Sequence, residues 1–228
     1  MKRIHIICEG QTEEMFIKEL LYLPFLDRGL ILVPALIGKP GHKGGNFRIE
    51  RLLPDVRNRL LGDPDSFCTT FFDFYGLPPE FPGKAAASEF TNAKPKEKAE
   101  TVCNAMIETL TAPIGPDAMQ RFIPYIQMFE FEALLFSDPE GLARGVESPE
   151  LSDHFKQIRR SFDSPESIND CPQTAPSKRI SKKVVGYQKP IYGSLAAMEI
   201  GLPSMRQECA GFDAWLTQLE GLAEEVDV

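Results

Sequence analysis

Cysteine is scarce in this sequence and forms no recognisable pattern. The 228 residues include five cysteines, and no two of them form a C-x-x-C pair. An odd, scattered set argues against a disulfide framework and against a structural zinc site. Cys8 and Cys68 lie inside apolar runs, where cysteine usually behaves as a small buried hydrophobic residue. We therefore expect a fold that its hydrophobic core holds together in a reducing compartment.

Long hydrophobic runs are also missing. No apolar segment approaches the roughly 20 residues that a transmembrane helix requires. The N-terminus begins Met1-Lys2-Arg3 and enters a short apolar segment that Glu9 interrupts, which is not the pattern of a signal peptide. At 43% hydrophobic residues, the chain can bury the core of one domain. We expect a cytoplasmic protein without a membrane partner.

Positive charge is not in excess. The formal net charge is -8 and the isoelectric point is about 5.1, which argues against a protein that coats nucleic acid through bulk charge. Basic residues nevertheless form two local clusters. Such clusters are usually solvated surfaces, and they gain weight only where they flank an acidic site. They are Lys39, His42, Lys43, Arg48, Arg51, Arg57 and Arg59, and then Lys178, Arg179, Lys182, Lys183 and Lys189.

Familiar catalytic and phosphate-binding motifs are absent as well. No Ser/His/Asp or Cys/His pairing is indicated, and the glycine-rich segment 38–45 lacks the Gly-Lys-Ser/Thr of a P-loop. Its backbone amides and Lys43 could still meet phosphates, although an ordinary surface loop is the simpler interpretation. Ser177-Lys178-Arg179 opens a predicted helix, and it is either an anion site or a capped, exposed helix end.

The apolar pattern that is present predicts a β-α-β arrangement. Helical spacing is found from Thr12, the expected N-cap, to Leu21, and again over residues 47–61 and 96–111. Residues 84–94 are polar and predict a loop. Pro34 cannot donate a ladder hydrogen bond, so its strand should lie at a sheet edge or contain a bulge. Short apolar segments predict four strands at residues 3–8, 30–37, 67–72 and 122–129.

These elements define the expected fold class. It is α/β, with a mostly parallel sheet of four strands, or slightly more, flanked by helices. Residues 1–138 should form this core. Residues 139–228 should form a helical extension that packs on the core as part of one structural unit, with helices near 149–162, 177–185, 191–200 and 212–222.

Three of the predicted strands run directly into acidic residues, namely Glu9, Asp73 and Glu130. The carboxyl ends of parallel strands share one edge of a sheet, so these side chains should converge. Clustered carboxylates repel one another unless a cation or a proton neutralises them. Hard oxygen ligands suit Mg²⁺ or Mn²⁺. Glu13, one turn after Glu9, could also face the metal, and Glu132 is the alternative to Glu130 because only one of the two points to a given face of a strand.

Several motifs together resemble a known family. They include Glu9-Gly10-Gln11-Thr12-Glu13, Asp73-Phe74-Tyr75-Gly76, the run at 127–136 and the run at 174–179. In this combination, which extends over nearly the whole chain, they resemble the Toprim-like bacterial proteins called domain of unknown function 4276. The resemblance implies a Toprim-type sheet. In such sheets, a glutamate after the first strand and an Asp-x-Asp after a later strand carry metal-dependent cleavage or priming of nucleic acids.

The resemblance assigns roles to only some of these acids. Glu9 matches the glutamate and Asp73 the first aspartate, but Tyr75 stands where the second aspartate is expected. We infer that Glu130 or Glu132 supplies the missing ligand. The resemblance also implies a partner, since related Toprim nucleases often work beside an ABC-type or AAA-type ATPase in phage defence.

Our leading hypothesis is a Mg²⁺-dependent nuclease that acts on DNA or RNA. Glu9 and Asp73 would be catalytic, and Lys43, Lys178 and Arg179 would bind backbone phosphates. The competing hypothesis is a non-catalytic partner or regulatory subunit of an ATPase, which Tyr75 and the acidic net charge favour. Another Mg²⁺-dependent phosphotransfer reaction on nucleotides, and self-association, also stay open. The predicted metal ligands are Glu9, Glu13, Asp73, Glu130 and Glu132.

Overall fold

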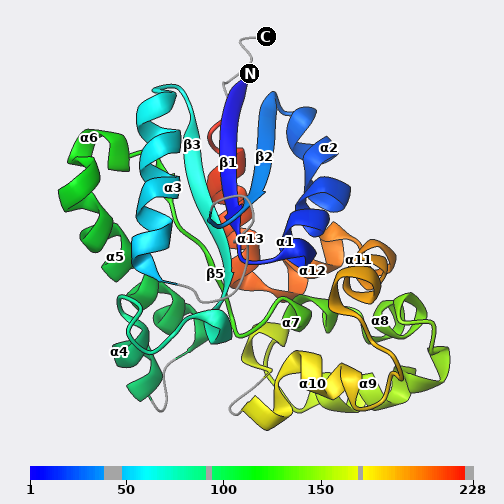
Figure 1. The fold of residues 1–228 in the computed structure, drawn as a ribbon. Coiled ribbons are helices and arrows are strands. Elements are labelled where there is room, and N and C mark those ends of the chain that lie inside the picture. The colour runs from blue at the N-terminus through cyan, green and yellow to red at the C-terminus, as the bar shows by residue number, and fades with distance from the viewer. Residues whose placement is uncertain (39–47, 91–93, 169–171, 224–228) are drawn as a thin grey trace.

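A parallel β-sheet lies at the centre of the molecule, with helices on both faces (Figure 1). The computed structural model describes residues 1–38, 48–90, 94–168 and 172–223. The strands follow the order β2-β1-β3-β4, β5 pairs with β3, and all of these pairs are parallel. The predicted α/β fold is therefore confirmed. The strands are β1 (Lys2–Cys8), β2 (Leu30–Leu36), β3 (Phe67–Asp73), β4 (Phe122–Ile123) and β5 (Ile126–Gln127).

The two faces of the sheet bury different sets of helices. On one face, Ile7 and Phe72 pack against helices α3 and α5. On the other face, Ile6 and Phe71 pack with α1 and with helices from the C-terminal part of the chain. Adjacent residues of a strand point to opposite faces, so both central strands read as continuous apolar runs. The helices before residue 120 are α1 (Gln11–Phe16), α2 (Tyr22–Leu26), α3 (Ile49–Gly62), α4 (Lys84–Glu89), α5 (Pro95–Ile114) and α6 (Pro116–Met119), with the π-helix η1 (Ile17–Leu21) and the 3₁₀ turn η2 (Phe74–Gly76).

The second half of the chain is helical in the part that the structure describes. Helices α8 and α12 were not predicted from the sequence, whereas the other longer helices fall near their predicted positions. The helices are α7 (Glu132–Leu135), α8 (Pro139–Gly145), α9 (Ser152–Arg160), α10 (Pro176–Ser181), α11 (Lys189–Ile200), α12 (Leu202–Glu208) and α13 (Ala210–Glu220), with the 3₁₀ turns η3 (Pro149–Leu151), η4 (Pro165–Ser167) and η5 (Pro172–Thr174).

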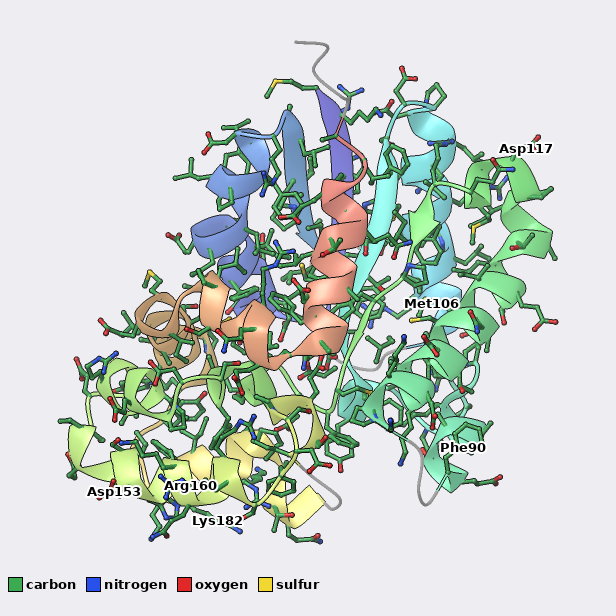
Figure 2. The ribbon with its side chains drawn as sticks, turned by 180° about the vertical axis from the view of Figure 1, so that it is seen from behind. Phe90, Met106, Asp117, Asp153, Arg160 and Lys182 are labelled. Atoms are coloured by element: carbon green, nitrogen blue, oxygen red, sulfur yellow. The ribbon has the colours of Figure 1, made fainter. Side chains whose placement is uncertain are left out.

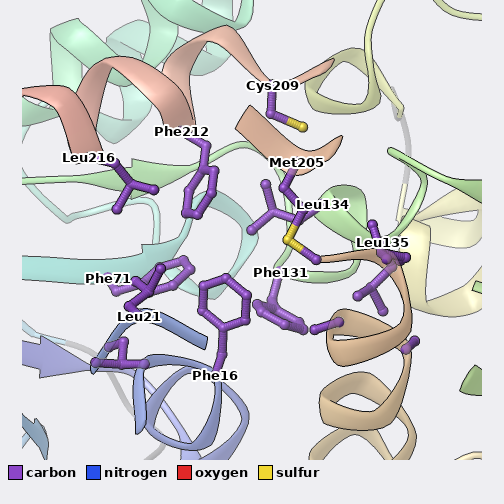
Figure 3. Packing of buried hydrophobic residues seen from close by; sticks show 14 of the residues in the cluster. Phe16, Leu21, Phe71, Phe131, Leu134, Leu135, Met205, Cys209, Phe212 and Leu216 are labelled. Atoms are coloured by element: carbon purple, nitrogen blue, oxygen red, sulfur yellow. The ribbon is translucent and has the colours of Figure 1, made fainter. Parts of the chain in front are cut away.

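Helix α13 covers the sheet on the face that Figure 2 shows from behind. The indole nitrogen of Trp215 donates a hydrogen bond of 2.9 Å to the Thr69 hydroxyl. The Trp215 ring stacks on Tyr125 at 4.5 Å between ring centroids. Nearby, the Phe16 ring lies 5.2 Å from Phe131 and 5.9 Å from Phe212 (Figure 3). One apolar cluster thus contains residues from both ends of the chain.

The fourth predicted strand is wrong as a single element. It is divided into β4 and β5 around Pro124, which has no N–H group to donate to a ladder. The Thr70 hydroxyl replaces the strand-ladder hydrogen bonds at this break. It accepts a hydrogen bond from the Tyr125 N–H and donates one to the Tyr125 carbonyl, both at 2.9 Å. The chain therefore stays beside β3 and still delivers Glu130 and Glu132 to the edge of the sheet.

Two other local predictions are also wrong. Helix α1 has Gly10, not Thr12, as its N-cap, because the Glu13 carboxylate accepts a hydrogen bond of 2.8 Å from the Gly10 N–H. The polar segment predicted as a loop contains helix α4. Lys84, its first residue, is buried and donates a hydrogen bond of 2.6 Å to the Phe74 carbonyl. A tertiary contact of this kind leaves no periodic signal in the sequence.

Two simpler predictions are confirmed. Pro34 lies in β2, at the edge of the sheet. Cys8 and Cys68 are buried as free thiols. None of the described helices is both long enough and apolar enough to cross a bilayer.

Candidate functional site

Glu9 and Asp73 lie next to each other at the carboxyl ends of two neighbouring parallel strands. Cys8 of β1 is in register with Phe71 of β3, so the chain leaves both strands at the same level. The Glu9 carboxylate accepts a hydrogen bond of 3.1 Å from the backbone N–H of Asp73. Strand pairing alone therefore brings together the two acids that were predicted to be catalytic.

The turn after Asp73 closes around the Glu9 side chain. A Cβ atom at Gly76 would lie 2.6 Å from the Glu9 carboxyl carbon, which is shorter than any normal contact. Only glycine allows the turn η2 to approach Glu9 this closely. Gly76 thus contributes to the site because its missing side chain leaves room for the Glu9 carboxylate.

Asp73 is buried without a full set of partners. Its side-chain oxygen Oδ1 has no hydrogen-bond partner among the described residues. Burial raises the pKa of Asp73 well above its ordinary value, and the nearby charges of Glu9 and Glu13 raise it further. An unpaired, buried carboxylate oxygen is energetically costly, so this atom is the one in the site that most needs a cation or a proton.

Glu13 approaches the same edge from the first turn of α1. It is buried, and the hydrogen bond from Gly10 accounts for one of its two carboxylate oxygens. Burial raises its pKa, and the charge of Glu9 adds to this effect. Glu13 therefore caps its own helix and also adds negative charge beside Glu9.

Glu130 and Glu132 both lie near the site, but each already has partners. The Glu132 side chain is fully buried, and its carboxylate lies 2.8 Å from the ammonium nitrogen of Lys189. The Tyr187 hydroxyl donates a longer hydrogen bond of 3.4 Å to the same carboxylate. The Glu130 carboxylate accepts a hydrogen bond of 2.9 Å from the Ser177 N–H and lies 4.0 Å from the Lys189 nitrogen. Lys189 thus pairs with both glutamates.

Lys189 is a site residue that the sequence analysis placed only in a basic cluster and did not assign to the site. It is the first residue of α11. Burial alone would lower its pKa, but the charges of Glu132, Asp73 and Glu130 raise the pKa above its ordinary value. Burial likewise raises the pKa of Glu132, and Lys189 offsets part of this shift. The available signal was a lysine at the start of a helix, where the helix dipole disfavours a cation unless carboxylates lie nearby.

The five predicted metal ligands do not form one cluster around an ion. Within the described part of the chain, no three Asp, Glu, His or Cys side chains are arranged as a metal site. Glu130 and Glu132 are occupied by Ser177 and Lys189, and one oxygen of Glu13 is occupied by the Gly10 N–H. Glu9 and Asp73 are the two acids that lie directly next to each other. Mg²⁺ commonly takes one or two carboxylates and fills its other positions with water and phosphate, so this pair, with its unpaired oxygen, fits such an ion.

The predicted phosphate-binding residues have different surroundings. Lys43 lies outside the described residues. The N–H of Ser177, a candidate anion donor, binds Glu130 instead. Lys178 is exposed, whereas the Arg179 guanidinium donates a hydrogen bond of 2.7 Å to the Thr174 carbonyl and lies 5.2 Å from the Phe162 ring centroid.

The fold and this site define a parallel α/β protein whose acidic side chains gather at the carboxyl ends of its strands. The chain belongs to the family described as Domain of unknown function (DUF4276), whose model matches residues 8–220. This match confirms the family that the sequence motifs resemble.

Among solved structures, the chain is similar to the C-terminal region of the OLD protein of Xanthomonas campestris pv. campestris, in two structures phased with platinum and with iodine. Each comparison has 12% sequence identity and a TM-score of 0.38. The first covers 96% of this chain and 97% of the other, and the second 95% and 97%. A search of curated proteins finds no match.

Proposed function

We propose that the chain is a Toprim-like nuclease that requires Mg²⁺ or Mn²⁺, cleaves DNA or RNA, and works in phage defence beside an ABC-type or AAA-type ATPase. The observation that carries the proposal is the buried Asp73 Oδ1 atom, which has no partner among the described residues, in a residue whose backbone N–H donates a hydrogen bond to the Glu9 carboxylate.

A divalent cation held by Glu9 and Asp73 would remove the main electrostatic problem of the site. Burial raises the pKa of both acids; the charges of Glu9 and Glu13 raise that of Asp73 further, and the charges of Glu130 and Glu132 add to that of Glu9. The ionised form of each acid is therefore unfavourable without a counter-charge. A bound ion would supply Lewis-acid stabilisation of a phosphodiester and lower the pKa of an attacking water molecule.

Lys189 has a separate electrostatic role in this proposal. Its ammonium group pairs with Glu130 and Glu132 and offsets one of their two negative charges on one side of the site. Without it, four or five carboxylates would repel an anionic phosphate. Lys189 therefore allows the acidic edge to accept a polyanion, while Glu9 and Asp73 stay free to bind the ion.

Basic side chains of α9, of α10 and of the segment directly after α10 are the proposed contacts for backbone phosphates. Arg160, Lys178 and Lys183 are exposed and form no ion pair within the described ranges. Arg160 and Lys182 lie along the same edge of the molecule in Figure 2. The Ser177–Glu130 hydrogen bond holds the start of α10 against the acidic site.

The test is a cleavage assay with plasmid DNA, single-stranded DNA and tRNA, in Mg²⁺, Mn²⁺ or EDTA, with and without any ATPase encoded next to the gene. Cleavage should require the metal, and Glu9→Gln and Asp73→Asn should each reduce it roughly 100-fold or more. Asp117→Asn, at an exposed position on the distant helix α6 (Figure 2), is the matched control. Cleavage that persists in EDTA or in both variants would refute the proposed site.

A second candidate function is a non-catalytic partner or regulatory subunit of an ATPase. It is favoured by Lys189, which already acts as a fixed cation among the acids, and by Tyr75 at the position of an expected aspartate. Metal binding separates the two candidates. Mn²⁺ should raise the melting temperature of the wild type but not that of Asp73→Asn if the site holds an ion. If Mn²⁺ has no effect on the wild type and no substrate is cleaved, the nuclease proposal fails and the second candidate is favoured.

A further inference from the structure

Helix α4 begins with a buried lysine that the proposed reaction does not use. Lys84 is only 8% exposed, and among the residues that the structure describes it pairs with no carboxylate. Burial and the charge of Lys98 lower the pKa of Lys84 to about 7. Lysine is almost never this buried without a paired acid, and a buried cation without a counter-charge costs stability. Core packing alone therefore does not account for a lysine at this position.

The Lys84 side chain makes two contacts with Phe74. Its nitrogen Nζ donates a hydrogen bond of 2.6 Å to the Phe74 carbonyl and lies 3.1 Å from the centroid of the Phe74 ring. Nζ carries N–H groups in both its charged and its neutral form, so the bond to the carbonyl does not depend on protonation. One nitrogen atom thus holds both the main chain and the side chain of Phe74.

Phe74 connects this contact to the acidic site. It follows Asp73 directly and is the first residue of the turn η2. The Asp73 N–H donates a hydrogen bond to the Glu9 carboxylate, and Gly76, at the other end of the turn, closes around the same carboxylate. A displacement of Phe74 would therefore move both the Asp73 N–H and Gly76 away from Glu9.

The helix that carries Lys84 is itself fixed to the rest of the fold. Helix α4 lies against α5 (Figure 1). At Gly83, the N-cap of α4, a Cβ atom would lie 2.7 Å from the Thr101 carbonyl oxygen and 3.0 Å from the Val102 Cα of α5. Helix α5 in turn buries Val102 and Met106 against the sheet. Lys84 therefore extends to Phe74 from a rigid support.

We propose that Lys84 is a positioning residue of the acidic site. Through Phe74 it holds the turn η2, and thereby keeps Asp73 and Glu9 at the separation that a divalent cation requires. Lys84 touches neither the ion nor the substrate in this role. The inference rests on the proposed function for its consequence in metal binding and cleavage, whereas the geometry of the turn can be measured without either.

Amide hydrogen exchange, measured by NMR without metal, tests the position of the turn. Lys84→Met keeps the length of the side chain but removes the donor. The Asp73 N–H, which binds Glu9, should then exchange about tenfold faster than in the wild type, while the Ile6 N–H inside β1 should keep its rate. Lys96→Met is the matched control, since the Lys96 side chain is 75% exposed on α5, and it should change neither rate.

Two outcomes of this measurement would overturn the proposal. Circular dichroism first establishes that Lys84→Met is folded. An unchanged Asp73 exchange rate in the folded variant would show that Lys84 does not hold the turn. Equal acceleration at Asp73 and Ile6 would show that Lys84 only contributes to general stability.

Metal binding and cleavage test the consequence for the site. Lys84→Met should weaken Mn²⁺ binding about tenfold and lower kcat roughly 10-fold to 100-fold, with KM close to that of the wild type because the proposed phosphate contacts are unchanged. A wild type that binds Mn²⁺ and cleaves, together with a Lys84→Met variant that does both equally well, would overturn the proposal. If the wild type does neither, the nuclease proposal has failed, and the exchange rate of the Asp73 N–H alone decides whether Lys84 positions the turn.

Discussion

At the scale of single residues, Asp73 destabilises the protein that carries it. Its carboxylate is buried beside Glu9 and Glu13 and has an unpaired oxygen. Without metal, Asp73→Asn removes the repulsion and should raise the free energy of unfolding by about 1–2 kcal/mol. Urea unfolding in EDTA measures the change, and Asp117→Asn, an exposed position, should leave it within error. A less stable Asp73→Asn would show that the carboxylate has a stabilising partner.

The second prediction concerns the steric fit between Gly76 and the Glu9 side chain. In Gly76→Ala the new methyl group would overlap the Glu9 carboxyl group, so Glu9 must move away from Asp73. Cleavage and Mn²⁺-induced stabilisation should both fall, while the fold is retained because Gly76 is exposed. Gly62→Ala is the control, since no atom lies within 4 Å of the added Cβ. Unchanged Mn²⁺ binding in Gly76→Ala would remove Glu9 from the proposed metal site.

The sequence predicted these residues unequally. Glu9 and Asp73 could be predicted as site residues because each follows a buried strand directly, and parallel strands bring their carboxyl ends together. The choice between Glu130 and Glu132 could not be predicted from the sequence. Both contact Lys189, which comes from more than 50 residues further along the chain, and a single sequence does not encode which distant cation reaches a given acid.

At the scale of elements, α11 contributes the counter-charge for Glu132. Lys189→Met would leave this fully buried carboxylate unpaired and should destabilise the protein by about 3–5 kcal/mol. Adding Glu132→Gln should restore much of the loss, so a double-mutant cycle should give a large coupling energy. Lys182→Met, at an exposed position, is the control. Additive effects of Lys189→Met and Glu132→Gln would show that the ion pair contributes nothing to stability.

Helix α4 gives a prediction about pH. Burial lowers the pKa of Lys84 from 10.5 to about 7, and the charge of Lys98 contributes. Below this range Lys84 is protonated in both the folded and the unfolded protein, and the buried cation lowers stability. Between about pH 7 and 10.5 only the unfolded chain binds the proton, so the Lys84 contribution to the free energy of unfolding rises with pH, by an amount on the order of a few kcal/mol.

Comparing wild type with Lys84→Met isolates this contribution from other groups that titrate in the same range. The difference in the free energy of unfolding between the two proteins should change steadily from pH 7 to 10. Lys98→Met, the neighbouring lysine of α5 for which burial is less, should keep a profile close to that of the wild type. Parallel profiles for wild type and Lys84→Met would mean that Lys84 titrates normally.

Element boundaries followed the sequence where periodic apolar residues set them, and failed where single tertiary contacts did. The helix around Leu52 and Val56 was predicted because its buried residues recur at helical spacing. The break between β4 and β5 depends on Thr70, which replaces a backbone partner next to Pro124. Helix α4 depends on the bond from Lys84 to Phe74. Neither contact could be inferred from local pattern.

At the scale of the whole molecule, the core and the helical extension predicted on either side of residue 138 are expected to unfold as one cooperative unit. We predict that residues 1–138 and 139–228 unfold together, because Trp215 of α13 stacks on Tyr125 and hydrogen-bonds to Thr69 of β3. Trp215 is the single tryptophan of the chain, so its fluorescence reports the docking of α13 on the sheet. The fluorescence and far-ultraviolet circular dichroism transitions in urea should coincide. A fluorescence change that precedes the loss of helix would identify the C-terminal part as a separate unit.

The position of Lys189 in the chain has a consequence for protein synthesis. The acids of the site, from Glu9 to Glu132, leave the ribosome well before the lysine that pairs with two of them. Until α11 has emerged and docked, the nascent chain holds Glu132 with no counter-charge. The acidic edge is therefore completed late in translation, when most of the sheet has already had time to form.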